Sequence, residues 1–383
     1  MPRKPKSIAL ESLLAAFSQV PDPRVARTRA HPLVNVLTMS FFGAISGAEG
    51  WDDLEIFAEE RADFFGTFLE LPEGATPCAD TFRRVFEALD PAAFQLAFRA
   101  WLKPLLDNLE GQTIAMDGKA LRGALAHARR SGGAFHLMHV WAAERHLLLG
   151  QQAVEGAPGE VQAAIELLQL LDLHGATVTA DANSCSAAVT AAVREAGADY
   201  VLALKGNRSA LHQHVEQLFA EAEANGYPGV KQFDSSDAAH GRIEHRIVRA
   251  MPLGTLPTRM KAAWTDLRSA VMIHRIRAAD HVSVGRAYYV TSHRPNAKHL
   301  AGRIRGHWSI ENQLHHSLDV SFGDDRRKIH SEHGAQNFAL LARHALSLLK
   351  RQPSKMSLAQ KRRRAAWGPQ YLLKVLAGGF NEV

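Results

Sequence analysis

The order of helices and strands predicted after Gly111 constrains the fold of this 383-residue chain more than any other feature. Up to about residue 110 the apolar residues recur at helical spacing, and beyond it alternating or continuous apolar stretches begin. Three strands are predicted first, followed by a helix, a strand, a helix and a strand. Their residues are 113–116, 136–142, 147–154, 160–171, 176–180, 184–195 and 200–204.

This β-β-β-α-β-α-β order matches the core of the ribonuclease H fold. We therefore expect an α/β protein with a ribonuclease H-like core over residues 111–349. A β-rich insertion at about 228–295 interrupts the core, and an all-helical domain over residues 1–110 precedes it. Residues 350–383 are expected to form a basic C-terminal tail. Phosphate contact by this tail is one interpretation and a solvated tail or helix face is the other.

Composition limits the compartment and the partners without selecting one. The net charge of +6 permits a polyanionic partner but does not require it. Cys78 and Cys185 have neither metal-ligand spacing nor a disulfide framework, which favours a reducing cytosol. The start MPRKPKS lacks the apolar segment of a signal peptide, and the apolar run over residues 33–48 is too polar to cross a bilayer. We expect a cytoplasmic protein without a membrane partner.

The stretch from Arg303 to Phe322 has two faces when it is read at helical spacing. A polar ribbon repeats every four residues and consists of His307, Glu311, His315 and Asp319. An apolar side is predicted from Ile304, Trp308, Leu314, Leu318 and Phe322. A carboxylate on the inner side of a helix needs a cation or hydrogen bonds, so Glu311 is expected to face positive charge. The alternative is an ordinary amphipathic helix with a solvated acid.

Two aspartates upstream favour a catalytic interpretation of Glu311. Asp117 and Asp181 each follow a predicted strand, where sites form in open sheets. If the three carboxylates converge, their mutual repulsion favours protonation unless a cation is present. Two divalent ions, with Mg²⁺ as the expected metal and Mn²⁺ left open, would remove that cost and support in-line phosphodiester chemistry. Rival third ligands remain, and these are Asp319, Asp324 and Asp325.

Several neighbours of these acids are candidates for binding or proton transfer. Lys119 and Lys205 follow predicted strands and are placed to hold substrate phosphates, with ordinary solvated lysines as the alternative. His307 and His315 lie one turn from Glu311 and are candidate ligands or proton carriers, although such histidines more often bond only to neighbours.

Many short motifs, in order along almost the whole chain, resemble those of the bacterial insertion-sequence DDE transposases that include the H-repeat-associated proteins. They include Asp22-Pro23-Arg24, His31-Pro32-Leu33, Asp80-Thr81-Phe82, Asp117-Gly118-Lys119, Leu202-Ala203-Leu204-Lys205-Gly206-Asn207, His240-Gly241-Arg242-Ile243-Glu244, His307-Trp308-Ser309-Ile310-Glu311-Asn312 and Leu318-Asp319-Val320. Each motif is weak alone, and their combination is specific.

The resemblance implies that Asp117, Asp181 and Glu311 are the Asp-Asp-Glu metal ligands. It implies Mg²⁺-dependent cleavage of double-stranded DNA at the terminal inverted repeats of a mobile element, followed by strand transfer into target DNA. The N-terminal helical domain is then a transposase-associated DNA-binding domain. A homodimer or higher assembly on paired ends is implied, in the bacterial cytoplasm at the nucleoid, with no small-molecule substrate.

The resemblance also suggests where DNA lies. Arg242 and Arg246 of the insertion are expected near the transposon end, and His307 is expected to contact DNA beside the acids. In the basic C-terminal segment, Arg362 and Arg363 are the expected phosphate contacts.

The sequence departs from the family pattern at a few positions, so two other functions stay open. Residues 182–186 lack the expected glutamine, residues 157–160 replace a run that usually carries Lys and Asn, and His316 stands where tryptophan is usual. One alternative is a catalytically weak or inactive transposase-derived DNA-binding protein, acting as a repressor or domesticated factor. The other is a metal-dependent nuclease without strand transfer.

Overall fold

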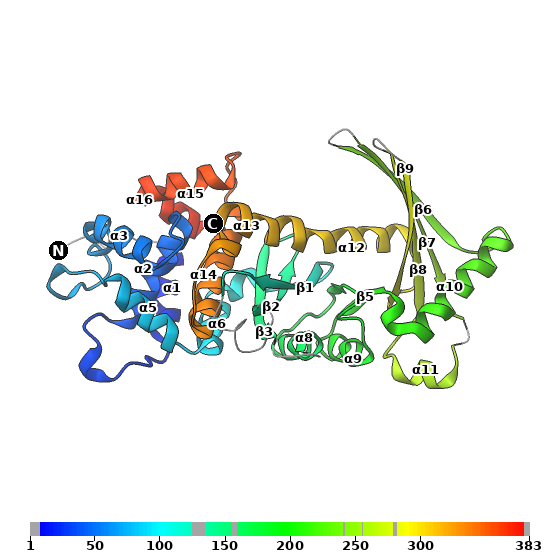
Figure 1. Cartoon of the computed structure of the whole chain (residues 1–383), viewed down its shortest axis with the longest axis horizontal. Coiled ribbons are helices and arrows are strands. Elements are labelled where there is room, and N and C mark those ends of the chain that lie inside the picture. Colours follow the sequence, from blue (N-terminus) through cyan, green and yellow to red (C-terminus); the bar gives the residue numbers. More distant parts are fainter. Residues whose placement is uncertain are drawn as a thin grey trace.

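The chain is a mixed α/β protein in which a helical N-terminal region adjoins a nine-stranded mixed sheet (Figure 1). A computed structural model describes residues 8–124, 135–154, 159–239, 242–254, 256–278 and 282–378. Its long axis passes from the N-terminal helices, through the first five strands, to four long strands at the far end (Figure 1). The His240-Gly241 motif and residues 157–158 lie outside the described residues, as does the side chain of Arg242.

Aromatic side chains hold the N-terminal helices together. The helices are α1 (Ile8–Ser18), α2 (Leu33–Ser46), α3 (Trp51–Glu60), α4 (Ala62–Phe65), α5 (Ala79–Ala88) and α6 (Pro91–Leu106), with short 3₁₀ turns η1 (Ala26–Thr28) and η2 (Pro72–Gly74). Phe41 meets Phe98 edge-on at 5.1 Å between ring centroids and Trp101 at 5.7 Å. Such pairs add to the free energy gained by area burial alone. Helix α2 is buried on nearly all sides, as its continuous apolar run requires.

The sheet has the order β3-β2-β1-β4-β5-β9-β8-β7-β6. The strands are β1 (Thr113–Leu121), β2 (Phe135–Ala142), β3 (Leu147–Val154), β4 (Thr177–Ala180), β5 (Asp199–Leu204), β6 (Lys231–Ala239), β7 (Arg242–Pro252), β8 (Ser269–Ala278) and β9 (Val282–Thr291). Strands β1, β4 and β5 are parallel, and the other neighbours are antiparallel. All the strands predicted in the 113–204 region are present.

Strand β1 is longer than predicted, and this changes the position of Asp117. The predicted strand ended at Met116, whereas β1 continues to Leu121 because its antiparallel pairing with β2 continues to Phe135. Only the parallel pairing with β4 ends at Met116, opposite Ala180. Asp117 therefore lies inside a strand, one residue beyond the end of the parallel ladder, and not at a strand end.

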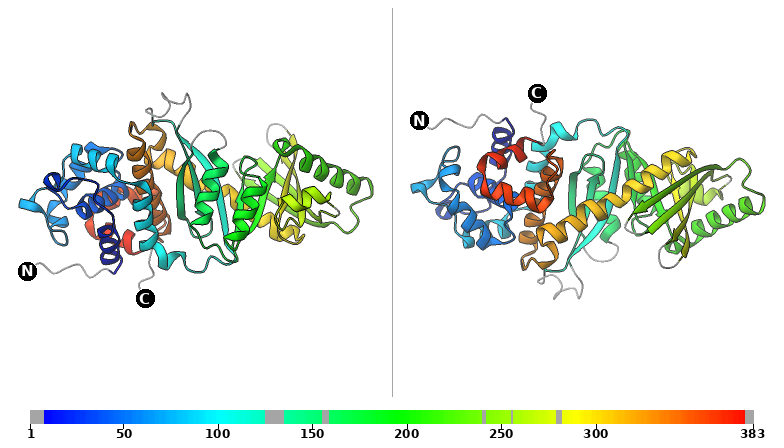
Figure 2. Two further views of the ribbon diagram at one scale, coloured as in Figure 1. Left: turned by 90° about the horizontal axis from the view of Figure 1, so that it is seen from below. Right: turned by 90° about the horizontal axis from the view of Figure 1, so that it is seen from above.

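Helices cover the two faces of the sheet. Helices α8 (Gly159–Gln169) and α9 (Ala187–Glu195) lie on one face, and α12 (Ala297–Ser309) crosses the other face from β7 to β1 (Figure 2). Helix α12 continues into a π-helical segment, η4 (Ile310–His315), and then into α13 (His316–Phe322). The remaining segments at the far end are η3 (Gly206–Arg208), α10 (Ser209–Ala224) and α11 (Thr258–Ala263).

The C-terminal segment folds against the N-terminal helices. After the 3₁₀ turn η5 (Asp324–Arg326), helix α14 (Glu332–Arg351) packs against α2, α5 and β3. Residues 350–377, expected as a basic tail, instead end α14 and form α15 (Leu358–Trp367) and α16 (Pro369–Ala377), which contact α2 and α1. Apolar residues between the cations, such as Ala365 and Leu372, supply the buried faces.

Across the described part of the chain, no helix combines the length and apolar character needed to cross a membrane.

Candidate active site

Two neighbouring parallel strands, β1 and β4, bring Asp117 and Asp181 to the same end of the sheet, just beyond the carboxyl end of their parallel pairing. The register pairs Met116 of β1 with Ala180 of β4, so each aspartate is the next residue along its chain. Local backbone bonds orient both carboxylates, because Gly118 N donates to Asp117 Oδ1 at 2.9 Å and Ser184 N donates to Asp181 Oδ1 at 3.3 Å.

The polar ribbon of the helix faces these two strands. His307 Nδ1 lies 3.2 Å from Thr179 Oγ1, two residues before Asp181. His315 Nδ1 lies 3.5 Å from the carboxylate of Asp117. Glu311 is midway between the two histidines along the chain; it is exposed, and its charge acts on Asp117.

Glu311 lies in a turn that is wider than an α-helical one. The segment η4 is a π-helix, a form that is rare and often marks functional sites. The wider turn changes the buried side, which contains Ile310 and Leu314, both fully buried. Trp308, predicted on the apolar side, is 40% exposed. The prediction for Trp308 was wrong, because this residue lies at the margin of the buried side of α12, one turn beyond the buried Ile304.

The three carboxylates interact electrostatically. Burial, together with the charges of Asp181 and Glu311, raises the pKa of Asp117 to about 7. Burial and the charge of Asp181 also raise the pKa of Glu311. The imidazole beside Asp117 does not offset this charge, because burial lowers the pKa of His315 to about 3 and leaves the ring neutral at physiological pH.

The rival acids differ from this group because each has a cationic partner. Asp319 accepts from Lys119 Nζ at 2.7 Å. Asp324 pairs with two arginines, and Asp325 lies 3.7 Å from Lys119. By contrast, no lysine or arginine among the described residues forms an ion pair with the three candidate acids. The only ion-pair partner of Asp117 in that part of the chain is the neutral His315.

The residues present fit divalent metal ions in their chemistry. Carboxylate oxygens are preferred ligands of Mg²⁺, and burial and neighbouring carboxylates both disfavour the charged form of Asp117. Within the described residues, however, no three His, Cys, Asp or Glu side chains already converge closely enough to hold an ion. Binding therefore requires the acids to move inward from the rotamers seen here.

Comparison with known proteins gives the family. The family model described as "Transposase DDE domain" matches residues 108–348, and the model described as "DDE_Tnp_1-associated" matches residues 14–102. This chain belongs to the DDE transposases.

Similar proteins include members from Escherichia coli. The chain is 31% identical to "Putative transposase YncI" of strain O157:H7, over 97% of this chain and 95% of that protein. It is 32% identical to "H repeat-associated putative transposase YhhI" of strain K12, over 96% and 98%. A shorter match, 38% identical over 20% of this chain, is to "Inactive transposase YbfQ" of the same strain.

A fourth carboxylate of this transposase was not predicted from the sequence. Glu160, in the first turn of α8, also raises the pKa of Asp117 by its charge. A Cβ atom on Gly118 would lie 3.2 Å from Glu160 Oε1, so the glycine leaves room for this carboxylate beside β1. A glutamate is a possible metal ligand, but nothing in the sequence shows that α8 begins next to β1.

A buried ion network packs against the site, and it was not predicted from the sequence either. Arg343 of α14 is fully buried, donates to Asp324 Oδ2 at 3.0 Å and donates from Nε to His139 Nε2 at 2.7 Å. His139 pairs with Asp117 across β1 and β2, and its ring meets that of His315 at 5.3 Å. The network thus packs against the residues that carry Asp117 and His315.

The predicted phosphate-binding lysines of this transposase have different surroundings. Lys119 is 8% exposed and held by Asp319, so its charge is already compensated. Lys205 is exposed and begins a loop that is tied to the one after Asp181, because Asn207 Nδ2 donates to Ala182 O at 2.6 Å. Lys205 is thus an exposed cation at the start of a loop that contacts the one after Asp181.

The predicted arginines also separate into compensated and exposed residues. Arg246 is 24% exposed and pairs with Asp237 and Glu244 at 2.5 and 2.9 Å. Arg362 is buried, stacks 4.0 Å from the Phe322 ring centroid and donates to Ser321 O, so the structure gives it a packing contact. Arg363 is exposed on α15.

Proposed function

We propose that this chain is an active DNA transposase of an insertion sequence, in which Asp117, Asp181 and Glu311 form the Asp-Asp-Glu site. One observation carries the proposal: three interacting carboxylates have no cationic partner among the described residues, whereas the neighbouring acids have one. Uncompensated acids of this kind are favoured where a cation binds, and they oppose folding otherwise.

The strand arrangement supports a ribonuclease H-like core for residues 111–349. The order β3-β2-β1-β4-β5, with β1 antiparallel to β2 and parallel to β4, has the three antiparallel strands and two crossovers that this fold requires. In this proposal, β6–β9 form the insertion, and residues 1–110 form a DNA-binding helical domain.

Each residue of the proposed site has a distinct task. Asp117 and Asp181 hold metal from the sheet, and Glu311 closes the site from the helix. His315 orients Asp117 from 3.5 Å, and His307 fixes the helix against Thr179. When bound, two Mg²⁺ ions would activate a water or a 3′-hydroxyl on one side of the phosphorus and stabilise the leaving oxygen on the other.

DNA is the proposed substrate, as element ends that are cut and as target that is joined. Lys205 beside the acids and Arg363 on α15 are exposed cations suited to duplex phosphates. Cutting and joining two ends together requires two active sites, which favours a homodimer or a larger assembly.

A DNA-binding protein without catalysis is the second candidate. The observation that favours it is the absence, within the described residues, of three side chains already close enough to hold an ion. A protein of this kind would bind the element ends without cutting them, and cleavage therefore distinguishes the two candidates.

The test is metal-dependent nicking and joining of a labelled duplex that carries the element's own ends. Asp117→Ala, Asp181→Ala and Glu311→Ala should abolish both steps in Mg²⁺ while still binding the duplex. Asp319→Ala, a compensated acid on the same helical stretch, is the matched control and should still join. If wild type binds the ends but does not cut them in Mg²⁺ or Mn²⁺, the proposal fails and the DNA-binding protein replaces it.

A further inference from the structure

Two histidines beside Asp117 each have a buried ring nitrogen without a hydrogen-bond partner among the described residues. His139 of β2 is fully buried, and its Nδ1 forms no hydrogen bond within that part of the chain. His315 of η4 approaches Asp117 through Nδ1, but its Nε2 is likewise buried and unpartnered there. The two ring centroids are 5.3 Å apart. A buried polar atom without a partner is costly, so two of them side by side call for an explanation.

The contact between Arg343 and His139 fixes the position of the proton on the His139 ring. A guanidinium group donates hydrogen bonds and cannot accept them. Since Arg343 Nε lies 2.7 Å from His139 Nε2, that ring nitrogen must carry the lone pair. The ring is therefore neutral, with its proton on Nδ1, the nitrogen that has no partner in the described structure.

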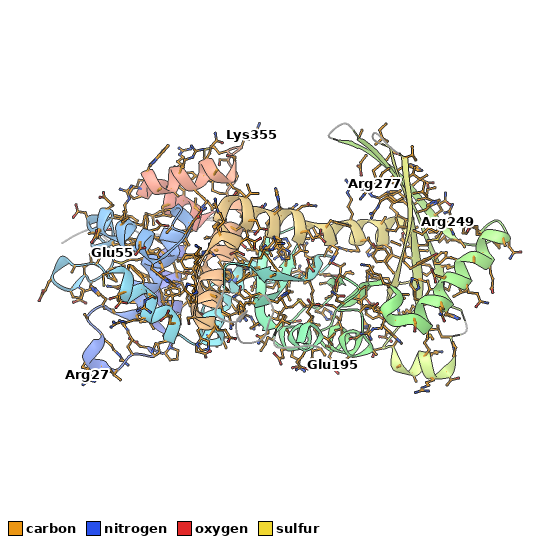
Figure 3. All side chains as sticks on the ribbon, in the orientation of Figure 1. Arg27, Glu55, Glu195, Arg249, Arg277 and Lys355 are labelled. Carbon is orange, nitrogen blue, oxygen red and sulfur yellow. The ribbon has the colours of Figure 1, made fainter. Side chains whose placement is uncertain are left out.

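The surroundings of His139 agree with a neutral ring. Burial and the charge of Arg343 hold the pKa of His139 well below its ordinary value. The backbone of Asp117 opposes this shift, but no well-aligned hydrogen bond joins it to Nδ1. Arg343 is itself held in place, because Asp324 Oδ2 accepts from it at 3.0 Å. Side chains fill the space between α14, which carries Arg343, and the adjoining strands (Figure 3).

His315 has the complementary arrangement of donor and acceptor. Its Nδ1 lies 3.5 Å from Asp117 Oδ2, and an ionised carboxylate can only accept, so Nδ1 is the donor and Nε2 keeps the lone pair. The unpartnered donor of His139 thus lies beside the unpartnered acceptor of His315. An N–H···N bond of about 2.9 Å between two imidazoles needs ring centroids roughly 5 Å apart, and the observed separation is 5.3 Å. Strand β2 and segment η4 therefore already lie at the spacing that such a bond requires.

We propose that a directional relay of hydrogen bonds positions Asp117 for metal binding, an inference that rests on the proposed function. Arg343 donates to His139, His139 donates to His315, and His315 donates to the carboxylate. Both rings are neutral. A neutral donor holds the carboxylate in one orientation without adding positive charge that would compete with a metal ion. His139 and Arg343 act only through other residues of this chain, so they are positioning residues and not ligands.

The first experiment examines the relay without metal and without activity. Nitrogen-15 NMR of the histidine rings of the full chain, in EDTA at pH 8, reports which nitrogen of each ring carries the proton. The two sets of signals are assigned by their loss in His139→Phe and His315→Phe. The relay predicts that both rings are neutral and protonated on Nδ1. A His315 ring protonated on Nε2, or a charged ring at either position, would overturn the proposal.

The second experiment compares Mn²⁺ affinities by calorimetric titration at pH 8. His139→Phe keeps a buried ring but removes both nitrogens, and it should bind Mn²⁺ about 10- to 100-fold more weakly than wild type, the usual cost of losing such a supporting group. His139→Gln retains an acceptor and a donor and should recover most of the affinity. His344→Phe is the matched control, because His344 is also a buried histidine but stacks on Phe98, at 4.2 Å between ring centroids, outside the relay. It should bind as wild type does.

These variants separate the relay from simple packing. If His139→Gln loses as much affinity as His139→Phe, or if His344→Phe loses affinity too, packing sets the affinity and the proposal is overturned. Equal affinities of His139→Phe and wild type would also overturn it. Urea denaturation in EDTA shows which variants are folded. If His139→Phe is not folded, His315→Phe removes the last donor of the relay and should show the same weakening.

The two proposals can fail separately. If wild type binds no Mn²⁺, the proposed active site fails, although protonation of both rings on Nδ1 would still show the relay. If wild type binds Mn²⁺ and cuts the element ends, and His139→Phe does both equally well, only the relay fails.

Discussion

Asp117 and Asp324 are two aspartates with little contact with water, and they have opposite electrostatics. Asp324 is fully buried, and Arg343 and Arg327 lower its pKa to about 2 despite the cost of burial. Asp117 is less completely buried, with 19% of its side chain exposed, and burial and two neighbouring carboxylates raise its pKa to about 7. The same residue type is thus stabilised as an anion at one site and destabilised as an anion at the other.

The difference separates acids that stabilise the fold from acids that are held ready for a ligand. A balanced group such as Asp324 gains nothing from an added cation, whereas the Asp117 group loses a repulsion when a cation binds. In the proposed site, this makes Asp324 a poorer third ligand than Glu311.

The largest expected effect is catalytic. Asp181→Asn should slow strand joining by at least about 10³-fold, because loss of a metal ligand removes several kcal/mol of transition-state stabilisation. Its free energy of unfolding should be unchanged or higher, as measured by urea denaturation in EDTA. If Asp181→Asn lost both activity and stability, Asp181 would stabilise the fold as Asp324 does, and the distinction between structural and catalytic acids would be weakened.

The largest expected effect on stability is at Asp324. Asp324→Asn leaves Arg343, which is fully buried, without its anion, and should lower the free energy of unfolding by about 3–5 kcal/mol. Urea denaturation at pH 7 measures this loss. Asp325→Asn is the control, since Asp325 is 27% exposed and its partners lie at 3.7 Å. A loss of equal size in both variants would contradict the special role of the buried pair.

The pH dependence of stability should have opposite signs for the two acids. The folded-state pKa of Asp117, about 7, exceeds its ordinary value of 3.8, so the stability from its protonated form is full below pH 3.8 and lost as the pH rises through 7. Asp117→Asn should therefore be more stable than wild type at pH 8, by up to about 4 kcal/mol at 1.36 kcal/mol per pKa unit, with little difference at pH 4. Urea denaturation in EDTA at both pH values measures this.

The depressed pKa of Asp324 gives the reverse dependence. Its contribution to stability is full above pH 3.8 and is lost as the pH falls through 2.

A stability difference between wild type and Asp117→Asn that did not change from pH 4 to pH 8 would show that Asp117 is not an uncompensated acid.

The smallest expected effect is at Lys119. Lys119→Met removes the cation from Asp319, which is 35% exposed and can regain water, so the free energy of unfolding should fall by about 1–2 kcal/mol. Thermal unfolding measures this change. If Lys119→Met lost as much free energy of unfolding as Asp324→Asn, the exposure of the remaining partner would not determine how destabilising the loss of an ion pair is.

The sequence predicted much of the core, because strands β1 to β5 are short apolar stretches with clear ends. Asp181 could be proposed from its place after β4, Asp117 from its place after the apolar start of β1, and Glu311 from the four-residue repeat around it. The Arg343–Asp324 pair could not be predicted, since a lone arginine in the apolar helix α14 gives no sign of which acid neutralises it. The same limit applies to Arg362, whose packing against Phe322 joins residues 40 positions apart. The π-helical turn at Ile310–His315 could not be predicted either, because residue spacing alone does not reveal it.

The most direct test of the central claim is calorimetric titration of Mn²⁺ into the full chain at pH 8, where Asp117 is mostly ionised. The account predicts that wild type binds at least one ion per chain and that Asp117→Asn/Glu311→Gln does not. Asp324→Asn is too destabilised to serve as a control, so Asp325→Asn is used and should bind as wild type does. If the double variant bound Mn²⁺ as well as wild type, or if wild type bound none, the three uncompensated carboxylates would not be a metal site.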